Sequence, residues 1–177
     1  GFLDKYYGPK QIIICIAGGI KSSDVFRFVE EKFSFLDGSN ILCPIEAKFK
    51  GGESRTEKEL EQAHFAFALE APNLTAPNLY DATVFTSILG GGMSSRLFQE
   101  IREKRGLCYS IFSFIETLSD TGSIVIYSGT GSEKISELSC VVAEEIRSLA
   151  CNVQDTEVVR AKAQMKSGIL MGLENPF

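Results

Sequence analysis

The hydrophobic residues of this chain recur with two different periods, and these periods predict its strands and helices. Residues 12–17 (IIICIA) form a continuous apolar run ahead of a glycine pair, which is typical of a strand buried on both faces. Residues 61–70 (EQAHFAFALE) alternate bulky and small side chains, which predicts a strand with one bulky face. Two more strands are expected at residues 108–115 and 123–129, joined by a hairpin connection over residues 117–122.

Apolar residues at three- and four-residue spacing predict a series of helices between and after these strands. Serine, proline or aspartate marks several of the helix starts, and glycine marks two of the ends. The predicted helices cover about residues 22–36, 77–89, 94–106, 133–149 and 155–173. Hairpin strands mixed with runs of helices indicate an α+β fold, in which helices cover one face of a mixed or antiparallel sheet.

Residues 37–58 (DGSNILCPIEAKFKGGESRTEK) lose this periodicity, and glycine, proline and charged residues dominate them. Such a composition is typical of a linker between domains. We therefore expect a strand–helix unit over residues 1–36 and a larger domain over residues 59–177.

Composition limits the function classes that fit the chain. Of its 177 residues, 44% are hydrophobic and 23% are charged, so the chain can bury a hydrophobic core without disulfides or structural metal ions. Its net charge of −5, with no basic patch beyond residues 102–105, argues against nucleic-acid binding. No apolar run approaches the roughly 20 residues that span a bilayer, so no membrane partner is expected. The chain starts at Gly1 rather than at Met, and we expect it to be a piece of a longer protein.

The side chains that commonly bind metals are sparse. The chain contains five cysteines: Cys15, Cys43, Cys108, Cys140 and Cys151. Their number is odd and no two form a Cys-x-x-Cys pair, so we expect small core residues in a reducing compartment rather than disulfides or a zinc site. His64 is the single histidine, which rules out a two-histidine metal motif and favours a structural or surface role. The acidic pairs Glu30-Glu31 and Glu144-Glu145 are expected on solvated helix surfaces.

Residues 89–109 (LGGGMSSRLFQEIREKRGLCY) concentrate the candidate chemistry. A glycine loop ahead of a helix can bind phosphate through its amides, but here a helix precedes the glycines and no lysine follows them. A flexible connection between two helices is the favoured interpretation, and an anion site is the second. Arg102 and Tyr109 are either a cation at a helix end and a strand aromatic, or two donors that converge across Gly106 on an oxyanion. Spacing alone favours the first of these interpretations.

The same segment closely resembles the second, non-catalytic domain of the pitrilysin/insulinase-type zinc peptidases. The nearest branch is the bacterial relatives of the mitochondrial processing peptidase β subunit. Residues 6–33 resemble the strand–helix segment that closes the first domain of such enzymes. Residues 119–130, 155–166 and 172–177 resemble later parts of the second domain.

The resemblance implies two similar domains that face each other around a chamber, with zinc held by the first domain. Residues 1–36 would then end that first domain, and residues 59–177 would be a C-terminally truncated second domain without a cofactor of its own. The resemblance also implies that Arg102 and Tyr109 reach the substrate carbonyl or the developing oxyanion. The glycine loop and a nearby strand edge would hold an extended peptide. The implied substrate-binding residues are Gly90, Gly91, Gly92, Met93 and Ser94.

We therefore expect the substrate-binding, zinc-free half of a zinc metalloendopeptidase, inactive on its own, in the bacterial cytoplasm or periplasm. Its expected partners are a peptide substrate and the zinc-bearing domain of the parent or of a partner subunit. The alternatives are a non-catalytic scaffold subunit of a heteromeric peptidase and an anion-binding module at the glycine loop. Because the two domains share one fold, residues 1–36 could also dock where the missing C-terminal strand and helix belong, within one chain or in a swapped dimer.

Overall fold

A computed structural model describes residues 2, 6–36 and 45–174 of the chain. The chain divides into two compact units, Gly1–Glu46 and Ala47–Phe177. The described part of the first unit contains a short 3₁₀ helix (Pro9–Gln11) and helix α2 (Ser22–Phe33). The predicted linker at residues 37–58 lies partly outside the described residues.

The apolar run at residues 12–17 was predicted to form a buried strand. This prediction is wrong, because the run does not form a strand. Its residues lie outside any sheet, and the side chain of Ile13 is 89% exposed. A strand forms only where a neighbouring strand satisfies its amide and carbonyl groups. No described residue of the chain pairs with this run, because the sheet contains only three later strands. An apolar, β-branched sequence is therefore not sufficient for a strand.

The second unit is built on a three-stranded antiparallel sheet. Its strands are β1 (Ala63–Ala71), β2 (Cys108–Thr117) and β3 (Gly122–Thr130), in the spatial order β1-β3-β2. Strands β2 and β3 form the predicted hairpin, and the turn is closed by a hydrogen bond from the Leu118 amide to the Thr121 carbonyl at 2.8 Å. Strand β1 then pairs with the free side of β3, so β1 and β2 are both edge strands.

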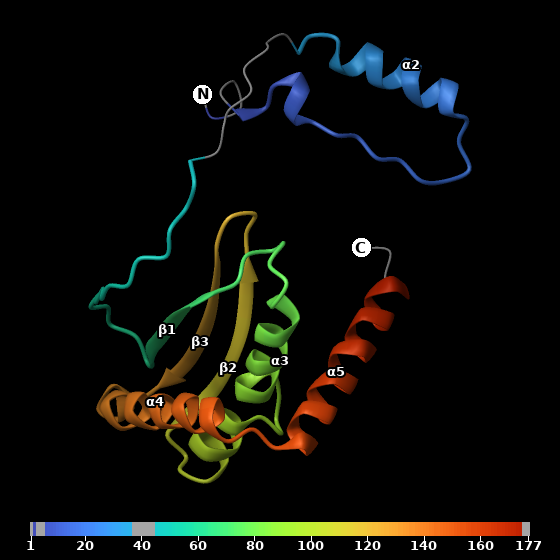
Figure 1. Cartoon of the computed structure of the whole chain (residues 1–177). Helices are drawn as coiled ribbons and strands as arrows, with labels where there is room; N and C mark the ends of the chain where they lie inside the picture. The colour runs from blue at the N-terminus through green and yellow to red at the C-terminus, as the bar shows by residue number, and fades with distance from the viewer. Residues whose placement is uncertain (1, 3–5, 37–44, 175–177) are drawn as a thin grey trace. The chain divides into compact units, whose positions relative to one another are not determined.

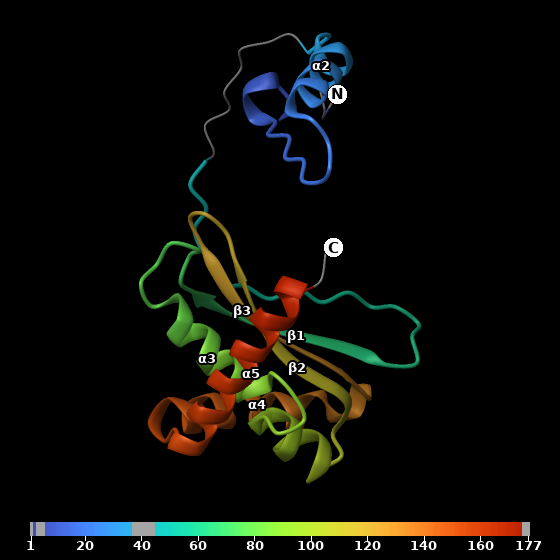
Figure 2. The ribbon, with the colours of Figure 1, turned by 90° about the vertical axis from the view of Figure 1, so that its right-hand side faces the viewer.

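Helices cover one face of this sheet. Helix α3 (Leu79–Gly90) packs against β2, and α5 (Asp155–Glu174) packs against α3, on the same side of the strands (Figures 1 and 2). Helix α4 (Ile135–Cys151) adds its apolar stripe to the same core. These elements confirm the predicted α+β fold. The buried core cluster consists of Ile88, Leu89, Leu97, Ile101, Leu107, Ile111, Ile126, Leu138, Val141, Val142, Leu149 and Ala161.

The opposite face of the sheet carries aromatic side chains that the described helices of the second unit do not cover. Phe112 on β2 lies opposite Tyr127 on β3, and their ring centroids are 5.1 Å apart. Phe112 and Phe114 are 44% and 42% exposed. His64 on β1 is exposed, as predicted, and its Nδ1 lies 2.6 Å from the Tyr127 hydroxyl.

The cysteines differ from the prediction that they are core residues. Among the four that the structure describes, Cys15, Cys140 and Cys151 are exposed, and none forms a disulfide. Cys108 is half-buried beside the core, and this burial raises the pKa of its thiol. Cys43 lies outside the described residues. The prediction failed because the apolar stripe of α4 passes through Leu138 and Val142, which leaves Cys140 on the solvent side of the helix.

Among the described helices, none combines the length and the hydropathy that a membrane-spanning helix requires.

Candidate functional site

The two predicted donors lie on either side of a helix end that turns into strand β2. Residues Phe98–Glu103 form a π-helix, in which the Lys104 amide donates to the Gln99 carbonyl at 3.0 Å. Single π turns of this kind are rare and occur frequently at functional sites. Because this turn interrupts the ordinary helical repeat, it sets which side chains of the segment face the core and which face solvent.

Gly106 ends this helix in the predicted way. Its φ of 59° lies in the left-handed region, where glycine has no steric penalty. The Gly106 amide donates to the Arg102 carbonyl at 3.1 Å, and the Leu107 amide donates to the Ile101 carbonyl at 3.0 Å. The bond from the Gly106 amide, which spans four residues, is that of an αL motif, which closes a helix and redirects the chain. The chain then enters β2, where a register shift lies between Cys108 and Ser110.

Both donor side chains reach solvent at this turn. The Arg102 side chain is 38% exposed, and its guanidinium carbon lies 4.6 Å from the centre of the Phe98 ring. Its nearest carboxylate is that of Glu103, at a distance of 3.9 Å. Tyr109 is 76% exposed at the start of β2. Neither group is buried, so each is open to a ligand outside this unit.

Buried residues pack against the core side of the same turn. Leu97 and Ile101 are fully buried, and Leu107 is 5% exposed. The Thr130 hydroxyl on β3 donates to the Leu107 carbonyl at 2.5 Å, which ties the turn to the sheet. Core packing therefore sets the backbone position of Arg102 and Tyr109, and the Arg102 side chain is held further by its contacts with Phe98 and Glu103.

The glycine loop connects α3 to the π-helical segment, as predicted, but it is not a loose connection. Its carbonyl groups accept hydrogen bonds from side chains of the surrounding helices. Gln164 donates to the Gly91 carbonyl at 3.1 Å, Gln99 to the Met93 carbonyl at 2.7 Å and Arg160 to the Ser94 carbonyl at 3.0 Å. An anion site requires amides that point outward, so this arrangement gives no support to phosphate binding.

An ion pair anchors the residue that follows the loop. Arg96 donates from Nε and Nη2 to the two carboxylate oxygens of Glu157, both at 2.7 Å. It also donates to the Asn152 carbonyl at 2.6 Å and to the Ser148 hydroxyl at 3.2 Å. Both charged side chains are only 14% exposed. The hydrogen bond from Arg96 holds the pKa of Glu157 below its ordinary value, and the same bond raises the pKa of Arg96.

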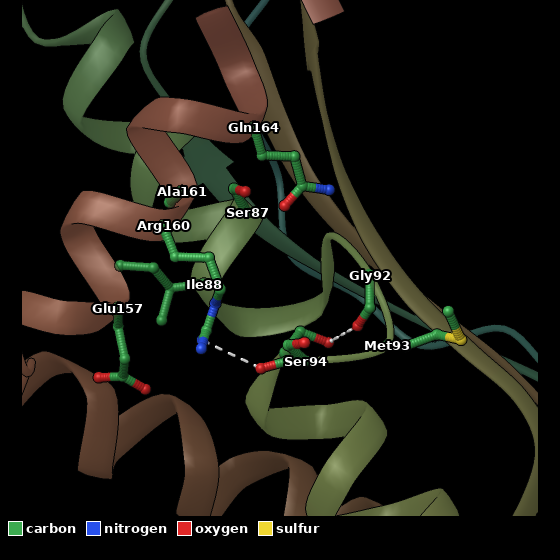
Figure 3. Close-up of a pocket in the computed structure, with 10 residues that line it drawn as sticks. Ser87, Ile88, Gly92, Met93, Ser94, Glu157, Arg160, Ala161 and Gln164 are labelled. Atoms are coloured by element: carbon green, nitrogen blue, oxygen red, sulfur yellow. Dashed lines mark hydrogen bonds between the residues drawn. The ribbon is translucent and has the colours of Figure 1, made fainter. Parts of the chain in front are cut away.

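An open pocket of about 260 Å³ lies between the glycine loop and α5. Figure 3 shows Arg160 and Gln164 extending from α5 toward the loop, with the Arg160–Ser94 hydrogen bond drawn as a dashed line. Met93 extends away from this contact and is 74% exposed. The predicted substrate-binding loop therefore forms one wall of a pocket whose other wall is α5.

The described residues do not form a site for zinc. Within residues 2, 6–36 and 45–174, no three His, Cys, Asp or Glu side chains lie close enough together to hold a metal ion. The hydrogen-bonding donors at the turn are a guanidinium and a phenol, and neither is an ordinary zinc ligand.

Sequence reasoning missed the side chains that hold the loop. Arg96 and Glu157 are 61 positions apart in sequence, and Gly91 and Gln164 are 73 apart, so no local pattern pairs them. Glu145 was expected on a solvated surface, but it is half-buried. Burial raises its pKa, and the charge of Glu100 adds to this effect.

Comparison with known families assigns this architecture. Residues 1–165 match the model of the family described as the peptidase M16 inactive domain. This chain belongs to that family. The family is that of an inactive peptidase domain, as the resemblance of residues 89–109 implied, so the family prediction is confirmed.

Relatives of this M16 domain carry the name of zinc proteases. An uncharacterized zinc protease of Rickettsia felis is 36% identical over 98% of this chain, which covers 42% of that protein. The zinc protease YmxG of Bacillus subtilis is 32% identical over 98% of the chain, which covers 43% of that protein. The chain therefore spans less than half the length of these two relatives.

Solved structures share the fold. A protease from Helicobacter pylori superposes with a TM-score of 0.79 at 20% identity, over 98% of this chain and 44% of that one. The peptidase M16 inactive domain from Pseudomonas fluorescens superposes with a TM-score of 0.57 at 25% identity, over 62% of this chain and 27% of that one. The division of the M16 chain into residues 1–36, 37–58 and 59–177 stays a prediction.

Proposed function

We propose that this chain is the non-catalytic, substrate-binding half of a zinc-dependent metalloendopeptidase. In this proposal, Arg102 and Tyr109 donate hydrogen bonds to the carbonyl oxygen of a bound peptide. The observation that carries the proposal is the turn at Gly106, which presents both donors to solvent from a buried base. Membership of the M16 inactive-domain family, whose relatives are called zinc proteases, supports the metalloendopeptidase assignment.

The chemistry of the two donors suits an oxygen that gains negative charge. Arginine stays protonated at every working pH, and a phenol donates a hydrogen bond without carrying charge. Such donors stabilise a transition state when they are already in place before charge develops, because no reorganisation is then required. Packing of Leu97, Ile101 and Leu107 beneath the turn supplies this preorganisation.

The peptide itself would lie in an extended conformation. Among the described residues, strand β2 is hydrogen-bonded to β3 alone, so its other side can accept a further strand. Extended peptides commonly bind by adding to such an edge. Tyr109 lies on this strand, and the glycine loop with the exposed side chain of Met93 belongs to the same segment of chain. This loop, residues 90–94, would contribute the remaining contacts.

Zinc would be held by another domain of the parent protein or by a partner subunit, since the described residues do not form a metal site. This chain alone would then cleave no peptide. Its contribution is to bind the substrate and to direct two donors at the carbonyl oxygen.

The decisive experiment replaces the donors in the complete parent protein. Arg102→Ala and Tyr109→Phe should each reduce kcat for peptide cleavage by about 10²–10³, the loss that follows removal of one oxyanion donor. Arg105→Ala, which removes an exposed arginine of the same segment, is the matched control and should leave the rate unchanged. Unchanged cleavage by Arg102→Ala would refute the proposal and favour the scaffold subunit.

A further inference from the structure

Helix α5 carries three polar side chains on the face that lines the pocket beside the glycine loop. Glu157, Arg160 and Gln164 follow one another at intervals of three and four residues, which places them on one face of a helix. Ala161 lies among them and is 2% exposed, so the helix packs against the core at this residue. All three side chains line the pocket in Figure 3.

Each of the four consecutive loop carbonyls from Gly91 to Ser94 accepts a hydrogen bond from a side chain. Helix α5 supplies the donors at the two ends, through Gln164 and Arg160. The π-helical segment supplies the donor to Met93, through Gln99. The hydroxyl of Ser95 donates to the carbonyl of Gly92 at 2.5 Å.

This arrangement fixes a segment that has little conformational preference of its own. Three successive glycines have the widest backbone freedom of any sequence, and ordering them costs the most entropy. With the carbonyls turned toward these donors, the side chain of Met93 extends to solvent. The ion pair of Arg96 with Glu157 holds the end of the loop to the first turn of α5.

We propose that α5 positions the glycine loop for the peptide substrate, with Arg160 and Gln164 acting as positioning residues through their hydrogen bonds to the loop carbonyls. Neither residue needs to touch the substrate. This inference rests on the proposed function, in which residues 90–94 hold the peptide. It adds that substrate affinity depends on a helix outside the binding segment.

The first measurement is hydrogen exchange of residues 90–95 in the complete parent protein. Gln164→Glu keeps the size of the side chain but removes its amide donor, and Arg160→Ala removes the guanidinium. Each variant should increase amide exchange in the loop by roughly five- to tenfold, the effect of losing one hydrogen bond. Arg160→Lys keeps a donor and should restore part of the protection. Lys162→Ala and Lys166→Ala alter exposed residues of α5 with no loop contact, and should change nothing.

The second measurement is peptide cleavage by the same proteins. Gln164→Glu and Arg160→Ala should raise KM about fivefold and leave kcat within a factor of two, because the loop binds the peptide before reaction. A purely structural role would lower the active fraction and leave KM unchanged. This split also separates the inference from the proposed function, since loss of Arg102 acts on kcat.

Two outcomes would overturn the inference. If exchange of residues 90–95 is unchanged in Gln164→Glu and Arg160→Ala, α5 does not hold the loop. If exchange rises but KM stays constant, the hold on the loop has no part in substrate binding. In both cases the Arg102→Ala result stands separately and decides the proposed function.

Discussion

The two sides of the segment from Arg96 to Tyr109 have opposite environments. On one side Leu97, Ile101 and Leu107 are between 0% and 5% exposed, and they join the helices to the sheet. On the other side Arg102 and Tyr109 reach solvent, and their side chains make few contacts. One short segment therefore carries part of the core and, by our proposal, the chemistry. Stability and activity should therefore depend on different residues of this segment.

Truncation on the buried side should have the largest effect on stability. Ile101→Ala removes a fully buried side chain and leaves a cavity, so the free energy of unfolding should fall by about 3–4 kcal/mol. Tyr109→Phe changes only an exposed hydroxyl and should stay within about 0.5 kcal/mol of the parent chain. Urea unfolding of the chain, followed by circular dichroism, measures both. Equal losses in the two variants would break the comparison.

The ion pair at the N-terminal end of this segment should have the next largest effect. Glu157→Gln removes the charge that pairs with Arg96 and should lower the free energy of unfolding by about 2–3 kcal/mol at pH 7. Because the pKa of Glu157 is lowered in the folded chain, its carboxylate stabilises the fold above its ordinary pKa of 4.5. That contribution is lost as the pH falls through the lower folded-state pKa.

The difference between the parent chain and Glu157→Gln should therefore shrink below pH 4.5, which urea unfolding at several pH values would detect. Glu145 acts in the opposite direction, because its raised pKa means that its ionisation costs stability at neutral pH. Glu144→Gln, which removes an exposed carboxylate of α4, is the matched control and should leave the free energy of unfolding at pH 7 within about 0.5 kcal/mol. A constant difference down to pH 3 would show that the ion pair is not responsible.

Among the destabilising changes, the one at the turn between the two sides should have the smallest effect. Gly106→Ala introduces a Cβ at a φ of 59°, where an ordinary residue is strained by about 1 kcal/mol. No atom lies within 4 Å of the position that this Cβ would take, so the cost is conformational rather than a clash. Gly106→Asn should lose less, because asparagine tolerates the left-handed region. Thermal unfolding would rank the three chains, and a loss above about 3 kcal/mol would contradict this account.

The buried side of this segment was predictable because its signals are local. Leu97 and Ile101 stand at helical spacing, and Gly106 is the residue type most often found just past a helix end. The π turn was not predictable, since nothing in residues 98–103 distinguishes it from an ordinary helix. The exposure of Arg102 and Tyr109 follows from where the core lies, which only the folded chain defines.

Contacts between distant segments account for the other failures of prediction. The run at residues 12–17 has every local feature of a strand, yet strands are defined by their neighbours. The loop carbonyls accept hydrogen bonds from α5 because the loop packs beside this helix in the folded chain. No residue spacing in the sequence predicts this contact. The family resemblance located the loop and the two donors but not the helix that holds the loop.

The central strand of the sheet is the last of the three to be synthesised. Within the described part of the chain, strands β1 and β2 are not paired with each other, and each pairs with β3. Both must therefore wait for Gly122–Thr130 before any backbone ladder can form. The hairpin between β2 and β3 can close at once, whereas β1 must be recruited across fifty residues of intervening chain. We expect β1 to be the last strand to join and the first to separate, so mutations in its ladder should act mainly on the rate of unfolding.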